Sequence, residues 1–497
     1  MSDPVSTPVL RGGRLRWWVL AALSAAQLLL VLDSTVMNVA LPTTQADLGF
    51  TDAERPWVIT AYALTFGSLL LVGGRLADSV GRKRLLLVSL AGFIIASLIG
   101  GFATGFSMLV IARTLQGISG ALMAPATLSS LATAFADTPG RGKAFGIFGA
   151  VSSSGSAVGL ILSGFLTEYL DWRWCLLINV VIGFTIAALV IKLLPQDDAR
   201  SRHPARPDVL GALTSVLGVL AIVYGCTIAE SRSWTDPLTI GAIVGGLLLL
   251  ALFTLIETRV PRPVLPMHVV LDRNRGGAYL MVTIGGIGMF GVFLFLTYYV
   301  QNVLGFAPLA TGLAFLPMVL MLVIGAIVAG GALLPRMGAR ALAVTGLAVA
   351  AAGAASFTAI DASSTYPLGI LPGLVVTGAG FGLVFGPAMN LATLGVAPED
   401  SGAASAMVNA AQQIGAAFGT AVLNPIAVSA TAAHLAPHPE TVDAAAASLI
   451  HGNTVAFWTT SAILLVGALA CGLLIEPGRG ADAAHSADDT AESAPIA

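Results

Sequence analysis

Residues Gly74 to Arg84 read GRLADSVGRKR, and this polar stretch separates two apolar ones, 57–77 and 85–104. A helix needs about 20 apolar residues to cross the hydrocarbon core of a bilayer, and both flanking stretches meet that length. A charged side chain at the centre of a membrane helix costs roughly 2.5–3.5 kcal/mol on insertion scales, so the charges of this stretch belong at the water boundary. The pattern predicts a loop between two membrane-spanning helices.

The composition of the whole chain points the same way. The protein has 497 residues, of which 56% are hydrophobic and 10% are charged, and its mean hydropathy is +0.88. Soluble domains carry about 25% charged residues, so we expect a polytopic membrane protein in a lipid bilayer. The net charge of −2 gives no reason to expect a nucleic-acid partner. The three cysteines lie in apolar runs, so neither a disulfide framework nor a metal site is expected.

Fourteen stretches are long and apolar enough to span the membrane. The first follows a basic segment, as a signal peptide would, but it is too long for one and is expected to remain as an anchor. The predicted spans are 17–40, 57–77, 85–104, 107–132, 144–166, 174–194, 209–229, 237–256, 277–303, 309–334, 341–360, 366–396, 403–428 and 454–475.

Basic residues predict the orientation, because loops on the cytoplasmic side of a membrane are enriched in Lys and Arg. With the N-terminus inside, 20 of the 24 Lys and Arg residues fall on the cytoplasmic side. Arg55, Arg173 and Arg232 fall outside, and Arg113 falls within a span. Both termini are therefore expected in the cytoplasm. The high Ala and Gly content suggests a GC-rich bacterial genome, and we expect a multi-pass protein of the bacterial inner (plasma) membrane.

Two groups of residues recur at nearly equal offsets, which predicts an internal repeat. Gly74 and Gly81 recur 257 positions further on, in GALLPRMGAR (Gly331 to Arg340). A second set recurs 260 positions further on: Gly142, Gly155 and Gly159 as Gly402, Gly415 and Gly419. We expect two six-helix halves at 1–200 and 271–478, an inserted pair of helices with linkers at 201–270, and a disordered cytoplasmic tail at 479–497.

Four longer motifs follow one another along the chain. They are LDSTVMNVALP (Leu32 to Pro42), RTLQGISGA (Arg113 to Ala121), DWRWCLLINVVIG (Asp171 to Gly183) and YYVQNVLGFAPLATGLAFLP (Tyr298 to Pro317). With the loop at Gly74, they are similar to signatures of the major facilitator superfamily, and within it of the fourteen-helix drug:proton antiporter family. The resemblance implies an all-α membrane fold of two six-helix halves plus two inserted helices, with substrate bound between the halves near the midplane.

The same resemblance implies a function. It predicts a monomeric secondary transporter, not an enzyme, that exports amphipathic organic compounds such as drugs or antibiotics in exchange for protons by alternating access. No cofactor is expected, because the proton gradient supplies the energy. A uniporter or proton symporter of a small metabolite on the same fold stays open. A membrane enzyme or a sensor would need a cluster of embedded His, Asp or Glu, and Asp33 with Arg113 is too few. The chain has no G-x-x-x-x-G-K-[ST] motif, which disfavours an ATP-driven pump.

The fifth helix departs from the family pattern. The antiporter signature Gly-x-x-x-Gly-Pro-x-x-Gly-Gly retains Gly155, Gly159 and Gly164, but Leu160 replaces the proline and Ser163 replaces a glycine. The glycines still permit close helix packing and are candidate gating residues. The missing proline would remove a kink, so this departure favours the uniporter or symporter alternative.

Asp33 is the acid that lies deep within a predicted span, and Arg113 is the corresponding base. Burial disfavours a charged carboxylate, so Asp33 could load and release a proton as its surroundings alternate between wet and dry. At 1.5 Å per residue both side chains lie roughly 10 Å below the outer surface, so Arg113 could pair with Asp33 and promote release of its proton. The alternatives are a carboxyl group that only pins helices and a structural arginine bonded to backbone carbonyls.

The loop at Gly74 is interpreted as a conformational latch. The resemblance implies that Asp78 bridges to a neighbouring helix and closes the inner gate, with Arg82 four residues further on. Gly74 and Gly81 would allow close approach and turning of the backbone. The alternative is an ordinary positive-inside loop. The second copy has Pro335 in place of the acid, so its half is expected to contribute mostly shape.

The substrate pocket is the least determined part. The resemblance places predicted spans 1, 4, 9 and 12 around a central cavity, and an apolar wall with sparse polar groups suits an amphipathic molecule. Most of the candidates are expected to serve packing instead. They are Gln27, Asn38, Gln116, Phe290, Phe293, Tyr298 and Asn390. His434, His438 and His451 match no metal motif, and no metal is expected.

Overall fold

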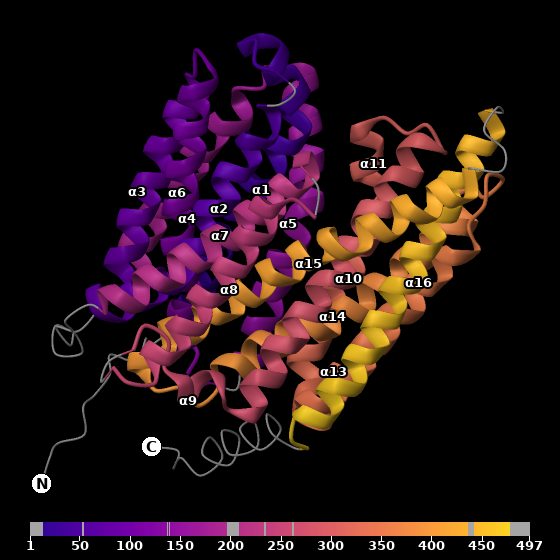
Figure 1. Ribbon diagram of the computed structural model, residues 1–497. Coiled ribbons are helices and arrows are strands. Elements are labelled where there is room, and N and C mark those ends of the chain that lie inside the picture. Colours follow the sequence, from indigo (N-terminus) through magenta and orange to yellow (C-terminus); the bar gives the residue numbers. More distant parts are fainter. Residues whose placement is uncertain are drawn as a thin grey trace, which may run out of the picture. The chain divides into compact units, whose positions relative to one another are not determined.

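The computed structural model describes residues 13–51, 54–136, 138, 140–195, 208–232, 235–260, 263–435 and 442–477 (Figure 1). Within these ranges the regular elements are helices, and no strand occurs. The predicted all-α class is confirmed. The tail expected at 479–497 lies outside the described residues.

Long helices follow one another with short connections (Figure 1). The first eight are α1 (Gly13–Leu48), α2 (Arg55–Val80), α3 (Arg82–Gly101), α4 (Phe106–Ala134), α5 (Arg141–Tyr169), α6 (Trp174–Leu193), α7 (Val209–Arg232) and α8 (Pro237–Glu257). The others are α9 (Met267–Val270), α10 (Arg273–Asn302), α11 (Pro308–Ala314), α12 (Leu316–Val328), α13 (Leu334–Ser356), α14 (Leu371–Thr393), α15 (Ser401–Leu435) and α16 (Val442–Leu474). The short elements are η2 (Ala329–Leu333), η3 (Phe357–Ala359), η4 (Tyr366–Ile370) and η5 (Pro398–Asp400).

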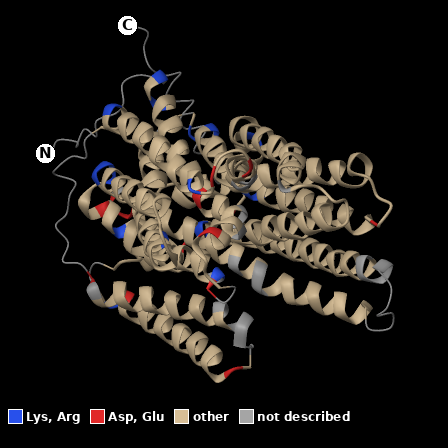
Figure 2. Cartoon of the chain, turned by 90° about the horizontal axis from the view of Figure 1, so that it is seen from above, with Lys and Arg blue, Asp and Glu red and all other residues tan. Residues whose placement is uncertain are grey.

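Ten stretches of the described residues are helical, long and apolar enough to cross a membrane. One of them, Leu309–Ala359, contains 51 residues and covers two predicted spans. Each of the fourteen predicted spans overlaps a helix, but the number that cross the bilayer stays a prediction, as does the cytoplasmic position of the termini. Figure 2 shows why the helices suit a bilayer: most of the ribbon is coloured as neither Lys or Arg nor Asp or Glu.

The chain forms two compact units that exchange short segments. The first comprises Met1–Ala136, Leu166–Val270 and Gly395–Asn409. The second comprises Asp137–Phe165, Leu271–Leu394 and Ala410–Ala497. The helices α7 and α8, predicted as an insertion, pack on each other and belong to the first unit. Most of α5 thus belongs with the C-terminal helices, and the start of α15 belongs with the N-terminal ones.

Each unit contains a tight crossing of two helices at a pair of glycines. In the first unit α2 meets the start of α15, and a Cβ added at Gly74 or Gly402 would overlap the carbonyl oxygen of the other residue. In the second unit α5 meets α12 and η2, and Gly142 and Gly330 stand in the same mutual relation. Gly142 and Gly402 are the residues that the 260-residue repeat pairs, so the two crossings are repeats of one another.

The partner of Gly142 is Gly330, whereas the sequence repeat pointed to Gly331, where an added Cβ would meet nothing within 4 Å. The offset from Gly74 to Gly330 is 256 positions, but it is 257 from Gly81 to Gly338. Both Gly81 and Gly338 have positive φ, 104° and 74°, at equivalent turns. Gly330 lies within the π-helix η2, which ends five residues before Gly338, and a π-turn accommodates one additional residue. The offset between the two repeats therefore changes from 256 to 257 positions at η2.

Candidate functional site

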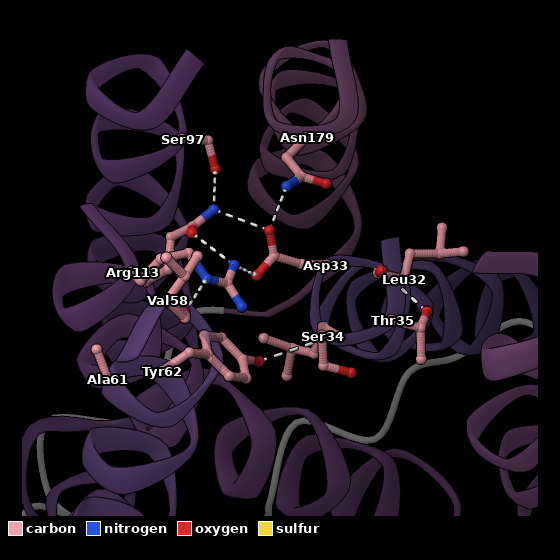
Figure 3. Close-up of polar contacts among 12 residues, drawn as sticks. Leu32, Asp33, Ser34, Thr35, Val58, Ala61, Tyr62, Ser97, Arg113 and Asn179 are labelled. Carbon is pink, nitrogen blue, oxygen red and sulfur yellow. Dashed lines mark hydrogen bonds and ion pairs between the residues drawn. The ribbon is translucent and has the colours of Figure 1, made fainter. Parts of the chain in front are cut away.

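Asp33 lies in the middle of α1 and is 1% exposed. Its neighbours on the helix direct their side chains back to the backbone, since Ser34 and Thr35 both donate to the carbonyl of Val31. The carboxylate is therefore left to side chains of other helices. It is the acid of a buried polar cluster drawn in Figure 3.

The ion pair that equal depth suggested is present. Arg113 on α4 donates through Nη1 to Oδ2 of Asp33 at 2.7 Å, and both side chains are at most 1% exposed. The guanidinium also donates to the backbone carbonyl of Val58 at 3.3 Å, and its Cζ lies 4.5 Å from the centre of the Tyr62 ring. The alternative of an arginine bonded to backbone carbonyls is thus partly right, because α2 holds the same side chain that pairs with Asp33.

Two amides complete the coordination of the carboxylate. Gln116 on α4 donates through Nε2 to Oδ1 of Asp33 at 2.8 Å and to the hydroxyl of Ser97 at 2.9 Å. Its Oε1 accepts from Arg113 at 2.8 Å. Asn179 on α6 donates through Nδ2 to the same Oδ1 at 2.6 Å. Two helices besides α1, namely α4 and α6, thus contact the carboxylate directly, and α2 and α3 hold Arg113 and Gln116, all within the first unit.

This arrangement suits proton exchange at a buried carboxyl group. Each hydrogen bond to the Asp33 carboxylate in the described structure comes from a donor, so the site matches an ionised carboxylate that balances one guanidinium. Removing either member of a buried ion pair leaves an uncompensated charge and costs about 3–5 kcal/mol. The cluster is therefore either held in this state or altered as a whole when a proton arrives.

The prediction from sequence did not include Asn179 and Ser97 in the site. Asn179 lies in the DWRWCLLINVVIG motif as the polar residue of an apolar run, which was a usable signal. Ser97 gave none, because serine is common in membrane helices and bonds readily to its own backbone. Gln116 was proposed to touch substrate, and the structure instead places it beside Asp33, with both ends of its amide bonded.

The other predicted pocket residues are dispersed. Buried Gln27 accepts from Thr127 at 3.5 Å, and the side chain of Asn38 lies outside the described part of the chain. On α10, Phe290 is half-buried and packs near Gly419, and Phe293 stacks on Phe315 with ring centres 4.4 Å apart. Tyr298 is 41% exposed. None of these contacts identifies a substrate.

Asp78, the predicted latch acid, receives the first backbone groups of α15. Its Oδ1 accepts from the amide of Gly402 at 2.9 Å, and its Oδ2 accepts from that of Ala403 at 3.3 Å. The N-terminus of a helix carries unpaired N–H groups and a partial positive charge, which a carboxylate satisfies. Arg82 donates to the hydroxyl of Ser401 at 2.7 Å and to that of Thr133. The predicted bridge to a neighbouring helix is therefore formed.

The second crossing also has a polar anchor, which the sequence did not lead us to expect. Arg141, at the start of α5, donates through Nε to Asn390 at 2.8 Å and through Nη2 to Thr393 at 2.9 Å. Thr393 and Thr133 are 260 positions apart, as are Ser401 and Arg141. Arg141 thus reaches, from the start of α5, the threonine equivalent to the one that Arg82 reaches from the start of α3. Asn390, a predicted pocket residue, is committed to this contact.

Among the glycines predicted for α5, Gly164 lies in a looser contact than Gly146 of the same helix. A Cβ at Gly164 would lie 3.5 Å from Leu309, which is ordinary contact. A Cβ at Gly146 would overlap the backbone of Ala326. Gly155 and Gly159 are buried in α5.

No metal centre is found among the residues that the structure describes, because no three His, Cys, Asp or Glu side chains converge there. His434 and His451 stack with ring centres 4.6 Å apart, and His438 lies outside the described residues. A second acid of α1, Asp47, pairs with Arg173 at 2.9 Å and is half-exposed. The Trp172 indole N–H donates to it and holds its pKa below the ordinary range, against weaker desolvation.

Comparison with known proteins places the chain. The family model described as Major Facilitator Superfamily matches residues 23–420. The chain is 48% identical over 463 residues to the puromycin resistance protein of Streptomyces alboniger, covering 93% of this chain and 92% of that one. It is 38% identical over 418 residues to the cephamycin export protein of Amycolatopsis lactamdurans, covering 83% and 86%.

Solved structures agree in fold. A proton:xylose symporter of the same superfamily matches with a TM-score of 0.62 at 14% identity, over 95% of this chain and 99% of that one. A human organic anion transporter matches with a TM-score of 0.61 at 16% identity, over 92% and 99%. The chain therefore belongs to the Major Facilitator Superfamily, whose members are multi-pass membrane transporters and not enzymes.

Proposed function

We propose that this protein exports amphipathic antibiotics across the bacterial inner membrane in exchange for protons, by alternating access. Relatives named for puromycin resistance and for cephamycin export support the direction and the class of substrate. The observation that carries the coupling is the buried Asp33, held by one guanidinium and two amides from other helices. A buried acid within a transporter is the kind of group that can bind a proton in one conformation and release it in another.

A single proton-binding acid provides enough driving force for export. One charge that crosses 100 mV supplies about 2.3 kcal/mol, and one pH unit supplies about 1.4 kcal/mol. Together they support roughly a few-hundred-fold gradient of a neutral substrate.

In this proposal the crossing held by Asp78 and Arg82 forms and breaks during each transport cycle.

The test uses purified protein in proteoliposomes, with puromycin as the probe and an imposed pH gradient. We expect Asp33→Asn to abolish proton-driven puromycin uptake into inverted vesicles. Asp47→Asn is the matched control, because Asp47 also lies on α1 and also pairs with an arginine, but at a half-exposed position. It should transport like the wild type. Proton-driven transport that persists in Asp33→Asn would refute the coupling assignment.

Uniport or proton symport is the alternative that the altered helix-5 motif, with Leu160 and Ser163, favours. The same vesicles distinguish the three modes. Antiport requires protons to move against puromycin, symport requires both to move together, and uniport leaves the internal pH unchanged.

A further inference from the structure

The two amides that contact Asp33 are held in different ways. Gln116 uses both ends of its amide, since Oε1 accepts from Arg113 and Nε2 donates to both Asp33 and Ser97. Among the described residues, Asn179 makes one hydrogen bond, from Nδ2 to Asp33. Figure 3 shows its oxygen directed away from the carboxylate. Asn179 is buried, with 1% exposure, so no bulk water competes for its amide.

This difference decides which amide can turn. The nitrogen and oxygen of an amide have nearly the same size, so a half-turn exchanges a donor for an acceptor without a change in packing. A half-turn of Gln116 would set its oxygen against the oxygens of Asp33 and its nitrogen against Arg113. A half-turn of Asn179 exchanges a single contact. Asn179 is therefore the partner of Asp33 that can accept as readily as it donates.

A carboxyl group that binds a proton needs such a partner. The ionised group only accepts hydrogen bonds, whereas the protonated group has one O–H to donate. The charged or titratable groups that face Asp33 in the described structure are Arg113 from α4 and Tyr62 from α2. The arginine has no acceptor, and the Tyr62 hydroxyl donates to the carbonyl of Leu30. An O–H on Oδ1 would otherwise be buried without an acceptor, which is costly.

We propose that Asn179 is a positioning residue that serves both protonation states of Asp33 by turning its side-chain amide. When a proton binds at Oδ1 of Asp33, a new O–H bond forms there, and this O–H donates a hydrogen bond to the side-chain oxygen of Asn179. On release the O–H bond breaks, the proton leaves to water, and Nδ2 of Asn179 donates to the carboxylate again. This inference rests on the proposed proton exchange and assigns one residue a role within it.

The experiment compares Asn179→Leu with Gln116→Met, two variants that remove an amide with little change in shape. The readouts are puromycin-driven proton release and puromycin transport by the full-length protein, each measured across a range of pH. Gln116→Met removes a donor that stabilises the ionised state of Asp33. We therefore expect the midpoint of the pH dependence of proton release to move to higher pH by about one unit. Asn179→Leu removes a partner from both states, so we expect less than half of that shift, with turnover at least about tenfold slower.

The results distinguish an Asn179 that serves both protonation states of Asp33 from one that only donates. A midpoint in Asn179→Leu that moves as far as in Gln116→Met would show that Asn179 only donates, and would overturn the inference. Wild-type turnover in Asn179→Leu would overturn it as well. If Asn179→Leu does not fold, Asn179→Ser removes the amide without adding an apolar group, and the same comparison applies. No proton release from the wild type would refute the proposed exchange itself, which separates the two failures.

Discussion

Asp33 and Arg113 form an ion pair from which water is excluded, so the stability of the protein and the chemistry of the site depend on the same atoms. Their Coulomb attraction is offset by the cost of taking both charges out of water. The pair is thus retained for a reason other than net stability, and proton exchange supplies one. A packing role alone would be served as well by two apolar side chains.

Arg113→Leu is expected to lower the free energy of unfolding by about 3–5 kcal/mol, because it leaves Asp33 buried and unpaired. Adding Asp33→Asn should restore most of that loss without restoring transport. Thermal unfolding of the detergent-solubilised variants, followed by tryptophan fluorescence, measures both effects. Arg173→Leu is the control, since its partly exposed ion pair with Asp47 contributes at most about 1 kcal/mol. Equal losses in the single and double variants would contradict the account.

At the scale of elements, the helices cross where glycine removes the side chain from the contact. Gly74 and Gly402 allow α2 and α15 to approach backbone to backbone, and Gly142 and Gly330 do so for α5 and η2. Small residues at membrane helix interfaces allow this approach, and they leave a contact that can separate without disturbing interdigitated side chains. Such crossings suit elements that must part and meet again during transport.

Adjacent glycines in η2 provide a matched test of the second crossing. A Cβ at Gly330 would overlap the backbone of Gly142, whereas a Cβ at Gly331 meets open space. We expect Gly330→Ala to destabilise the closed crossing by roughly 1.4 kcal/mol or more, and so to reduce puromycin transport at least about tenfold. Gly331→Ala should transport normally. Equal sensitivity of the two positions, at equal expression, would rule out the assigned register.

The register illustrates a limit of prediction from sequence. The repeat located the right pair of elements, but it pointed to Gly331 and not to Gly330. A π-turn adds one residue without a distinctive signal in a run such as AGGAL, so the sequence could not reveal the offset. The positive φ at Gly338, by contrast, follows from the same glycine-dependent turn as at Gly81 and was correctly paired.

At the scale of the whole molecule, each unit carries a copy of the same glycine crossing together with a polar anchor. Asp78 and Arg82 serve the first, and Arg141 with Asn390 and Thr393 serves the second. In the first unit the arginine is the first residue of α3, directly after the crossing helix α2, and in the second unit it is the first residue of α5, but the threonine it reaches is equivalent. A search for the same charged residue at repeated positions could not find this, because only the contact is repeated.

We expect both anchors to be needed for transport. Arg141→Gln should lower puromycin transport about as strongly as Asp78→Asn, because each leaves a buried or half-buried polar group without its partner. Lys143→Gln removes a charge two residues from Arg141 at an exposed position and should be tolerated, as should Pro335→Ala. Transport assays at matched expression decide the point. If Arg141→Gln is as active as wild type while Asp78→Asn is inactive, the C-terminal half contributes only shape.

The sequence alone determined the membrane class, the helical elements, the repeat and the two charges of the site. These properties are local, since they follow from runs of apolar residues, from loops rich in basic residues and from the cost of charge in hydrocarbon. Only the tertiary structure decided which side chains surround Asp33, which glycine of a pair meets the facing helix, and where Arg141 binds. Those outcomes depend on rotation and register between helices, and on contacts across 146 residues in the case of Asn179 and Asp33. A bilayer favours any apolar helix alike, so only the side chains that meet at a crossing select one arrangement.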